Sequence, residues 1–399
     1  MNPASSWPTW PLLAARTLRG FSDGYMALLL PAYLLALGLG GLAVGVISTA
    51  TMLGSATATL AVGAWGHRFA SRRLLTAAAL LMVATGVSFA GFMSFWPLLV
   101  VAFVGTLNPS SGDVSVFLPL EHAALAGAST AATRTGLFAR YSLLGSLAAA
   151  LGALATALPA GATTFGINRL DALRAMFLLY GATGVVIALL YRSLPAQAVA
   201  TQVTHTPLGA SRAIVIRIAA LFSVDAFAGG LVVNALLSLW LWQRFGLDLA
   251  QAGRFFFWSG LLGAGSQLVA PILARRIGLL NTMVFTHIPA NICLVLAALA
   301  PSLPAALTLL FIRSALSQMD VPTRRAYVMG VVTPPERAAA ASFTAVPRSL
   351  AAAISPTLAG ALFAAGFISA PLIACGLLKI GYDLALWRAF RLHPPRTDE

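Results

Sequence analysis

The residues best placed to do chemistry are charged side chains that interrupt long apolar runs. A charge near the centre of a bilayer costs from about 2.5 to over 10 kcal/mol, so charges in such runs mark function or obligatory pairing. Carboxylates there can take up and release protons, and guanidinium groups can bind carboxylate or phosphate. The charged residues inside the apolar runs are Asp23, Asp113, Arg140, Asp225, Arg313, Asp320, Arg348, Lys379 and Asp383.

Two Asp–Arg pairs are expected from the depth of these residues along their segments, at about 1.5 Å per residue. Asp113 and Arg140 fall at similar depths in consecutive segments, so we expect them to pair. Asp320 and Arg348 occupy the corresponding places in the second half of the chain and are expected to pair likewise. Each pair has two interpretations, a gating or structural charge pair, or an acid that carries protons.

Asp23 and Asp225 each lie about ten residues into an apolar segment, at 1.5 Å per residue about halfway across. No basic partner for either is apparent from the sequence. Burial without a partner favours the protonated form of a carboxylate, which suits a residue that binds and releases protons. Asp23, Asp225, Asp113 and Asp320 are therefore the candidates for proton coupling.

Arg313 has no counterpart in the first half, where the equivalent residue is Thr106. Its position near the middle of its segment and its guanidinium group point to binding of a small anion. The alternative is that it pairs with Asp320, seven residues on and on the same helix face. Lys379 and Asp383, four residues apart, are expected to neutralise each other.

The elements that must hold these residues are membrane-spanning helices. The chain has 399 residues, of which 59% are apolar and 9% charged, with a mean hydropathy of +0.87. Soluble domains carry about 25% charged residues, and a helix of about 20 apolar residues crosses the hydrocarbon core. An all-α fold with twelve spans is predicted at 13–38, 42–64, 73–93, 96–120, 132–158, 172–192, 213–241, 250–274, 280–300, 303–329, 338–365 and 369–390.

The basic residues set the orientation of these spans. The net charge is +14, yet most arginines form short clusters between apolar runs, as at Arg16/Arg19, Arg275/Arg276 and Arg324/Arg325. That placement is typical of cytoplasmic loops of membrane proteins and argues against nucleic-acid binding. The same bias places both chain ends in the cytoplasm. We expect a cytoplasmic tail at 1–12, halves at 13–192 and 212–390, a linker at 193–211 and a tail at 391–399.

The sequence gives little support to enzymatic or metal chemistry. The two cysteines, Cys293 and Cys375, lie inside apolar runs, and the five histidines show no metal-ligand spacing. A phosphate-binding loop, a nucleophile elbow and a zinc-protease motif are also absent from the sequence. No metal, cofactor or catalytic residue is therefore expected. Glu121 and Glu336 fall in equivalent loops, where surface salt bridges between helix ends are expected.

The two halves of the chain repeat one another. Asp23 aligns with Asp225 at an offset of 202, Arg72 with Arg275 at 203, Asp113 with Asp320 at 207 and Arg140 with Arg348 at 208. The offset drifts in one direction, as a few loop insertions would produce. Six helices per half make the two halves parallel, an arrangement that places a cavity between them.

The loop from Gly63 to Arg73 carries a family resemblance. Gly63, Arg68, Arg72 and Arg73 fit the G-x-x-x-D-R-x-G-R-R/K signature of the major facilitator superfamily, while His67 and Ala70 replace its acid and second glycine. With the repeat, the chain resembles that family over nearly its full length. The resemblance implies two pseudo-symmetric six-helix bundles, and for Arg68, Arg72 and Arg73 a gating or structural role.

The same resemblance implies a secondary transporter that works by alternating access in the cytoplasmic (inner) membrane, as a monomer. Proton-coupled efflux of a small molecule by antiport is the first expectation, and uptake of an anionic solute by symport, anchored by Arg313, is the alternative. A membrane-embedded sensor or enzyme without transport is the alternative of another class. Besides Arg313, the candidates for substrate binding are Asn234, Gln318 and Asn108, which could equally join neighbouring helices.

Overall fold

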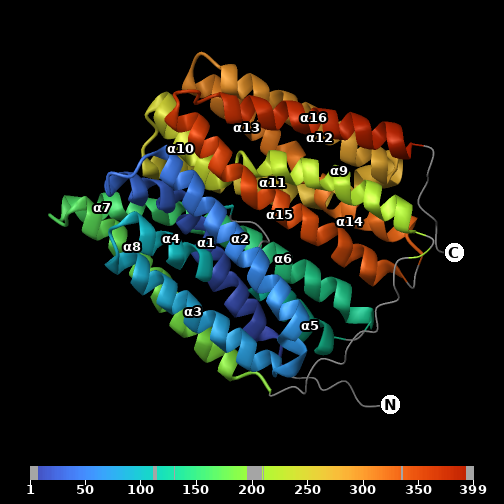
Figure 1. The fold of residues 1–399 in the computed structure, drawn as a ribbon, viewed down its shortest axis with the longest axis horizontal. Helices are drawn as coiled ribbons and strands as arrows, with labels where there is room; N and C mark the ends of the chain where they lie inside the picture. Colours follow the sequence, from blue (N-terminus) through green and yellow to red (C-terminus); the bar gives the residue numbers. More distant parts are fainter. Residues whose placement is uncertain are drawn as a thin grey trace. The chain divides into compact units, whose positions relative to one another are not determined.

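The structure, a computed structural model, describes residues 8–110, 115–129, 131–195, 209, 211–333 and 336–391. Within these residues all regular secondary structure is helical (Figure 1). The all-α fold predicted from the apolar segments is confirmed.

The first half of the chain forms helices joined by short turns. The turn after the first helix contains Gly38 with φ +79°, a left-handed conformation that favours glycine. The elements are α1 (Trp10–Ala36), α2 (Gly41–Trp65), η1 (Gly66–Arg68), α3 (Ser71–Gly91), α4 (Phe95–Val104), α5 (Phe117–Gly127), α6 (Ala131–Leu154), η2 (Ala155–Ala157), α7 (Leu158–Thr164) and α8 (Arg169–Arg192).

The second half continues in the same way. Gly278, with φ +87°, makes the sharp turn between two long helices, two residues after the basic pair Arg275 and Arg276. Cations in a last helical turn complement the helix dipole. The elements are α9 (Arg212–Gly230), α10 (Asn234–Phe245), α11 (Leu249–Ile277), α12 (Leu279–Leu299), α13 (Leu303–Ser317), α14 (Asp320–Val331), α15 (Arg337–Ala364) and α16 (Ala370–Phe390).

Each of the twelve predicted spans contains helix in the structure, and three of them are broken into two helices. The broken ones are 96–120 (α4 and α5), 213–241 (α9 and α10) and 303–329 (α13 and α14). By length and composition, eight stretches of the described chain are long and apolar enough to cross a membrane. The 27-residue helix α1 is long enough but carries Arg16, Arg19 and Asp23.

The described surface is apolar over long helix faces. Trp96 is 72% exposed, Leu268 64% and Leu299 61%, and large apolar side chains are exposed along many other helices. Soluble proteins rarely expose apolar area on this scale, whereas lipid tails solvate it well. The chain is thus a multi-pass membrane protein.

The chain divides into two compact units. Unit 1 takes the described residues up to 195 together with Asn234–Trp242 and Gly246–Phe257; unit 2 takes the rest. In unit 1, α1 packs on α6 and α3 packs on α8. In unit 2, α9 packs on α15 and α12 packs on α16. The first span contacts the fifth and the third contacts the sixth in each unit, so the internal packing repeats as the sequence offsets predicted.

Glycines bring α1 and α6 into backbone contact within unit 1. A Cβ on Gly24 would lie 2.0 Å from the carbonyl oxygen of Ala149, and one on Gly152 would lie 2.0 Å from that of Phe21. Small residues of this kind allow close helix packing in membranes. The contact fixes the register between α1 and α6, and with it the relative positions of the polar side chains they carry.

Candidate functional site

Unit 1 holds a buried carboxylate that four helices share. Glu121 on α5 forms an ion pair with Arg19 on α1, at 2.6 Å, and the two side chains are 0% and 2% exposed. The hydroxyl of Tyr191 on α8 donates to Glu121 Oε1 at 2.6 Å, and that of Tyr141 on α6 donates to Oε2. The Arg19 guanidinium also lies over the ring of Phe117, 4.5 Å from its centroid.

This cluster neutralises both charges away from water, although the Arg19 Nε has no hydrogen-bond partner among the described residues. A buried ion pair is stable only when additional hydrogen bonds reach its remaining lone pairs and protons. Here each carboxylate oxygen receives a phenol hydroxyl, and Arg19 also donates to Tyr191 at 3.3 Å and to Tyr141 at 3.2 Å. The cluster therefore ties α1, α5, α6 and α8 together at one level.

The prediction for these two residues was wrong. Arg19 was assigned to a loop cluster that sets orientation, and Glu121 to a surface salt bridge, yet both are buried in the interior of unit 1. Arg19 falls inside the predicted span 13–38 as well as inside α1, and the reason it can stay there is that Glu121, an acid from another helix, neutralises it. The signal that could have found the pair is a lone acid, Glu121, directly after an apolar run.

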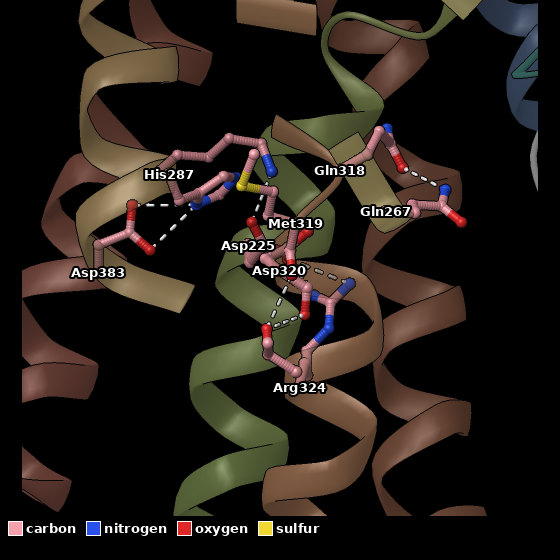
Figure 2. Close-up of polar contacts among 10 residues, drawn as sticks. Asp225, Gln267, His287, Gln318, Met319, Asp320, Arg324 and Asp383 are labelled. Carbon is pink, nitrogen blue, oxygen red and sulfur yellow. Dashed lines mark hydrogen bonds and ion pairs between the residues drawn. The ribbon is translucent and has the colours of Figure 1, made fainter. Parts of the chain in front are cut away.

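Unit 2 holds a second buried carboxylate, Asp225 on α9, between two cations (Figure 2). Lys379 on α16 donates to Asp225 Oδ1 at 2.5 Å, and Arg324 on α14 donates to Oδ2 at 2.9 Å. Arg324 also pairs with Asp320, one turn earlier on its own helix, at 3.4 Å. Asp320, Arg324, Asp225 and Lys379 thus form one chain of alternating charge across α14, α9 and α16.

A histidine–carboxylate pair adjoins this chain. His287 Nδ1 on α12 lies 3.0 Å from both carboxylate oxygens of Asp383 on α16 (Figure 2). The side chains are 6% and 1% exposed. Asp383 follows Lys379 by one helical turn, so α16 carries one residue of the charge chain and one residue of the histidine–carboxylate pair. We call Asp320, Arg324, Asp225, Lys379, Asp383 and His287 the unit 2 charge network.

Two pairings predicted in unit 2 are wrong, and so is the expectation that Asp225 has no partner. Asp320 pairs with Arg324 and not with Arg348, because a residue one turn along the same helix is closer than one on another helix. Lys379 pairs with Asp225 and Asp383 with His287, so these two residues of α16 do not neutralise each other. Asp225, expected to be without a partner, has two.

The remaining charged candidates lie in different surroundings. Asp23 is buried, 5% exposed, one turn after Arg19 on α1. Asp113 lies outside the described residues, so its pairing with Arg140 stays a prediction. Arg140 and Arg348 are both exposed, and neither forms an ion pair with another residue in the part of the chain that the structure describes.

Arg313 on α13 is half-buried and does not pair with Asp320. Its Nε atom is buried and has no hydrogen-bond partner among the described residues. The ionisable groups near it are the thiols of Cys293 on α12 and Cys375 on α16. A guanidinium with an unused buried donor is available for an acceptor from outside the protein.

The three amide candidates lie at the three helix breaks. Asn108 follows α4, and its side-chain oxygen accepts from the backbone N–H of Ser110 at 3.0 Å and from the Ser110 hydroxyl at 2.7 Å. Asn234 begins α10, where the Ala235 N–H donates to the Pro109 carbonyl at 3.0 Å. Gln318 follows α13 and accepts from Gln267 at 3.5 Å.

The loop that carries the sequence signature is exposed at two of its arginines. Arg68 in η1 and Arg73 in α3 are exposed, while Arg72 donates to the carbonyl of Leu194 at 3.3 Å. Arg72 thereby joins the start of α3 to the residue just after α8. The side chain of His67 lies outside the described part of the chain.

Glu336 holds the end of the predicted linker. The N–H groups of Gly209 and Ser211 donate to its two carboxylate oxygens, each at 3.0 Å, and the Thr333 N–H donates to the Ser211 hydroxyl at 3.2 Å. Hydrogen bonding, first from the Ser211 side chain and then from the backbone N–H groups of Gly209 and Ser211, lowers the pKa of Glu336, against an opposing effect of burial that is larger than either backbone contribution. Glu336 therefore accepts from backbone, where a surface salt bridge was expected.

Each unit contains a buried arginine that lies over a phenylalanine ring and pairs with a carboxylate, but the arginine is on a different span in the two units. In unit 1, Arg19 on the first helix lies between Phe117 and Glu121 of the fourth span. In unit 2, Arg324 on the fourth span of that half lies over Phe222, at 5.4 Å, and pairs with Asp225 of the first. The offset of 207 aligns Phe117 with Arg324, whereas the offset of 202 that aligns Asp23 with Asp225 places Arg19 opposite Leu221, one residue before Phe222.

A family model identifies the family of the chain. The family model described as Major Facilitator Superfamily matches residues 12–319. An uncharacterized membrane protein of Saccharomyces cerevisiae is 23% identical over 412 residues, which cover 94% of this chain and 92% of that protein.

Solved transporters share the fold. A bacterial homolog of the human lysosomal transporter Spinster, in an inward-facing and occupied conformation, matches with a TM-score of 0.78 and 15% identity over 100% of both chains. The xylose transporter XylE from E. coli matches with 0.74 and 14% over 98% of both chains. The nucleoside transporter NupG matches with 0.71 and 13% over 96% of this chain and 98% of that one.

Proposed function

Because the chain belongs to the major facilitator superfamily, we propose that it is a secondary active transporter that moves a small molecule across a membrane by alternating access. The transporter fold of its structural neighbours and its apolar helices support this assignment. We place it in the cytoplasmic membrane with both ends of the chain inside, on the distribution of its arginines.

The observation that carries the proposal is the set of breaks in three predicted spans. Irregular backbone at membrane depth is tolerated only where it is buried in protein or lines a water-filled cavity. In transporters, substrate sites are commonly built from such discontinuous helices. Asn108, Asn234 and Gln318 lie at these breaks, and their amide groups are the substrate-binding residues we propose.

Efflux in exchange for protons is the mechanism we favour. Coupling to protons requires a carboxylate or imidazole that changes charge during the cycle. Asp23 and Asp225 are buried at similar sequence positions in the two halves, and Asp225 already holds a chain of partners through which a change of charge would reach α14 and α16. Asp113 and Asp320 remain the further candidates.

Counterflow in proteoliposomes tests the assignment. Solutes from a thermal-shift screen of drugs, organic acids and metabolites would be loaded at high concentration inside vesicles, and uptake of labelled solute followed from outside. A transporter exchanges the label without any ion gradient. A protein that binds the solute but gives no exchange would be a sensor or an enzyme, and the proposal would be wrong.

Uptake of an anionic solute is the second candidate, favoured by the unused buried donor of Arg313. If Arg313 binds the anion, Arg313→Gln should weaken binding of anionic solutes by about tenfold or more, since a charge-assisted hydrogen bond contributes about 1.5–3 kcal/mol. Neutral analogues should lose little. The comparison is made by thermal shift or calorimetry, and equal loss for both classes would assign Arg313 a structural role.

A further inference from the structure

The unit 2 charge network does not balance without a proton. It contains three carboxylates, Asp320, Asp225 and Asp383, and two permanent cations, Arg324 and Lys379. With a neutral imidazole at His287 the network carries one negative charge in excess, and with an imidazolium it is neutral. An uncompensated charge in a membrane interior is costly.

The geometry identifies the atom that takes the proton. His287 Nδ1 faces both oxygens of Asp383 at 3.0 Å, and a carboxylate only accepts hydrogen bonds. Nδ1 must therefore carry a hydrogen while Asp383 is ionised. The additional proton binds at Nε2, the ring nitrogen that Asp383 does not contact.

The charged groups around His287 come from each helix that packs on α12. From α16 come Asp383, Lys379 and the Tyr382 ring, whose centroid lies 6.4 Å from that of the imidazole. From α14 come Asp320, Arg324 and the exposed Arg325, and from α13 comes Arg313 beside the two thiols. Beyond these helices, Asp225 of α9 is close enough for its charge and that of His287 to interact. Arg348 of α15 is exposed, and its charge acts on the other end of the network, first on Arg324 and then on Asp225 and Asp320.

We propose that His287, paired with Asp383, is the proton-binding site of unit 2, and that its charge is transmitted through Lys379 to Asp225. This inference rests on the proposed proton-coupled transport and names the site that performs the coupling. The proton enters from water on one side of the membrane, binds Nε2, and returns to water on the other side, so no bond other than N–H forms or breaks.

The contacts explain how loading would affect the helices. With His287 neutral, Asp383 lacks a cationic partner of its own and competes with Asp225 for Lys379, one turn away on the same helix. With His287 protonated, Asp383 is neutralised and Lys379 is left to Asp225. The proton thus sets the strength of the Lys379–Asp225 contact, which holds α16 to α9. Asp225 serves as a positioning residue that keeps Lys379 and Arg324 in place.

The first test measures protons directly, without any solute. Purified wild-type protein and the His287→Gln variant are titrated between pH 8 and pH 5 in the same detergent. Wild-type protein should bind one more proton per molecule over this range. Equal binding would mean that His287 keeps one protonation state throughout, which would overturn the proposal.

Asp383→Asn provides a second variant that keeps the shape of the pair. It removes the excess negative charge, so the variant should also bind one proton fewer than wild type. It retains a hydrogen-bond acceptor for His287, which makes it the informative variant if His287→Gln fails to fold. Proton binding unchanged in Asp383→Asn would contradict the charge balance on which the proposal stands.

The second test separates coupling from transport. Proteoliposomes contain a pH-sensitive dye and are given the solute that stabilises wild-type protein in the thermal screen. Wild type and His122→Gln, a matched substitution in unit 1, should move protons when the solute moves. His287→Gln and Asp383→Asn should keep counterflow and lose proton movement. Retained proton movement in both would overturn the site, whereas absence of counterflow in wild type would overturn the proposed function itself.

Discussion

At the scale of single residues, Glu121 shows how one buried carboxylate can organise a helix bundle. It accepts from Arg19, Tyr141 and Tyr191, which come from three other helices. Breaking a buried pair by removing one partner leaves an uncompensated charge, a far larger loss than removing an exposed pair. The loss of stability on changing Glu121 is therefore set by the buried charge of Arg19, which would remain without a partner.

The first prediction concerns this residue. Glu121→Gln should destabilise the protein by about 3–5 kcal/mol, because Arg19 would stay buried without a counter-charge. The apparent melting temperature in detergent measures the effect. A double variant, Arg19→Met with Glu121→Leu, should melt at a higher temperature than Glu121→Gln, since it removes both charges of the pair.

Arg140→Gln serves as the control for a single change of charge. Its side chain is exposed, so the substitution should leave the melting temperature close to that of the wild type. If Glu121→Gln melted at the wild-type temperature too, the buried pair would contribute nothing to stability.

The sequence located most of the buried charges and mispaired them. Depth along an apolar run can be counted from the sequence, so Asp23, Asp225 and Asp320 were expected inside helices and are found buried there. Partners depend on how each helix is rotated and which neighbour it contacts, and neither follows from depth. The Asp320–Arg324 pair is the one that sequence spacing could have predicted, because residues four apart on one helix are neighbours.

At the scale of helices, two features position the polar side chains: close contact between helices and breaks within spans. Glycines let α1 and α6 meet backbone to backbone, and three spans are interrupted where amide side chains lie. Hydrophobic run length predicted helix in each of the twelve segments, where the structure has it, but none of the breaks, because an interrupted run remains apolar throughout. Turn residues such as Asn108-Pro109 were the available signal.

A pair of glycines on α6 provides the second prediction. Gly152→Ala would place a Cβ 2.0 Å from the backbone oxygen of Phe21, so α1 and α6 must separate, at a cost of about 1–3 kcal/mol. Gly136→Ala, in the same helix, meets open space and should be neutral or slightly stabilising through its better helix propensity. Melting temperatures of the two variants that do not differ would contradict the close contact.

The end of the linker provides a prediction about pH. Because its hydrogen bonds lower the pKa of Glu336 below its ordinary value of 4.5, the stabilisation they give is complete above that value. It is lost as the pH falls through the lower, folded-state pKa. Glu336→Gln should therefore melt below wild type at pH 7, and the difference should shrink at acid pH. A difference that is constant with pH would show that the carboxylate charge plays no part.

At the scale of the whole molecule, the repeat was the most informative feature of the sequence. The offsets that align Asp23 with Asp225 and Arg72 with Arg275 led to two six-helix halves, and the packing inside each unit follows the same plan. Family membership and the structural neighbours are in accord. The identity of the transported molecule was out of reach, because it depends on a few side chains around a binding site and not on the architecture.

The transport cycle gives a prediction at this scale. If Asp23 is the proton carrier of unit 1, Asp23→Asn should abolish accumulation driven by a pH gradient and retain counterflow. Asp225→Asn should impair both, because Lys379 and Arg324 would lose their shared counter-charge. Both rates are measured in proteoliposomes with the solute found by thermal shift. Driven accumulation that persists in both variants would exclude these two acids.

The placement of the buried arginines means that the two halves cannot replace one another. Arg19 stands on the first span of its half and Arg324 on the fourth span of the other, and each lies over a phenylalanine ring. Their acids are exchanged in the same sense, with Glu121 at the end of the fourth span of one half and Asp225 on the first span of the other. A protein assembled from two copies of either half would therefore duplicate one charge cluster and lack the other.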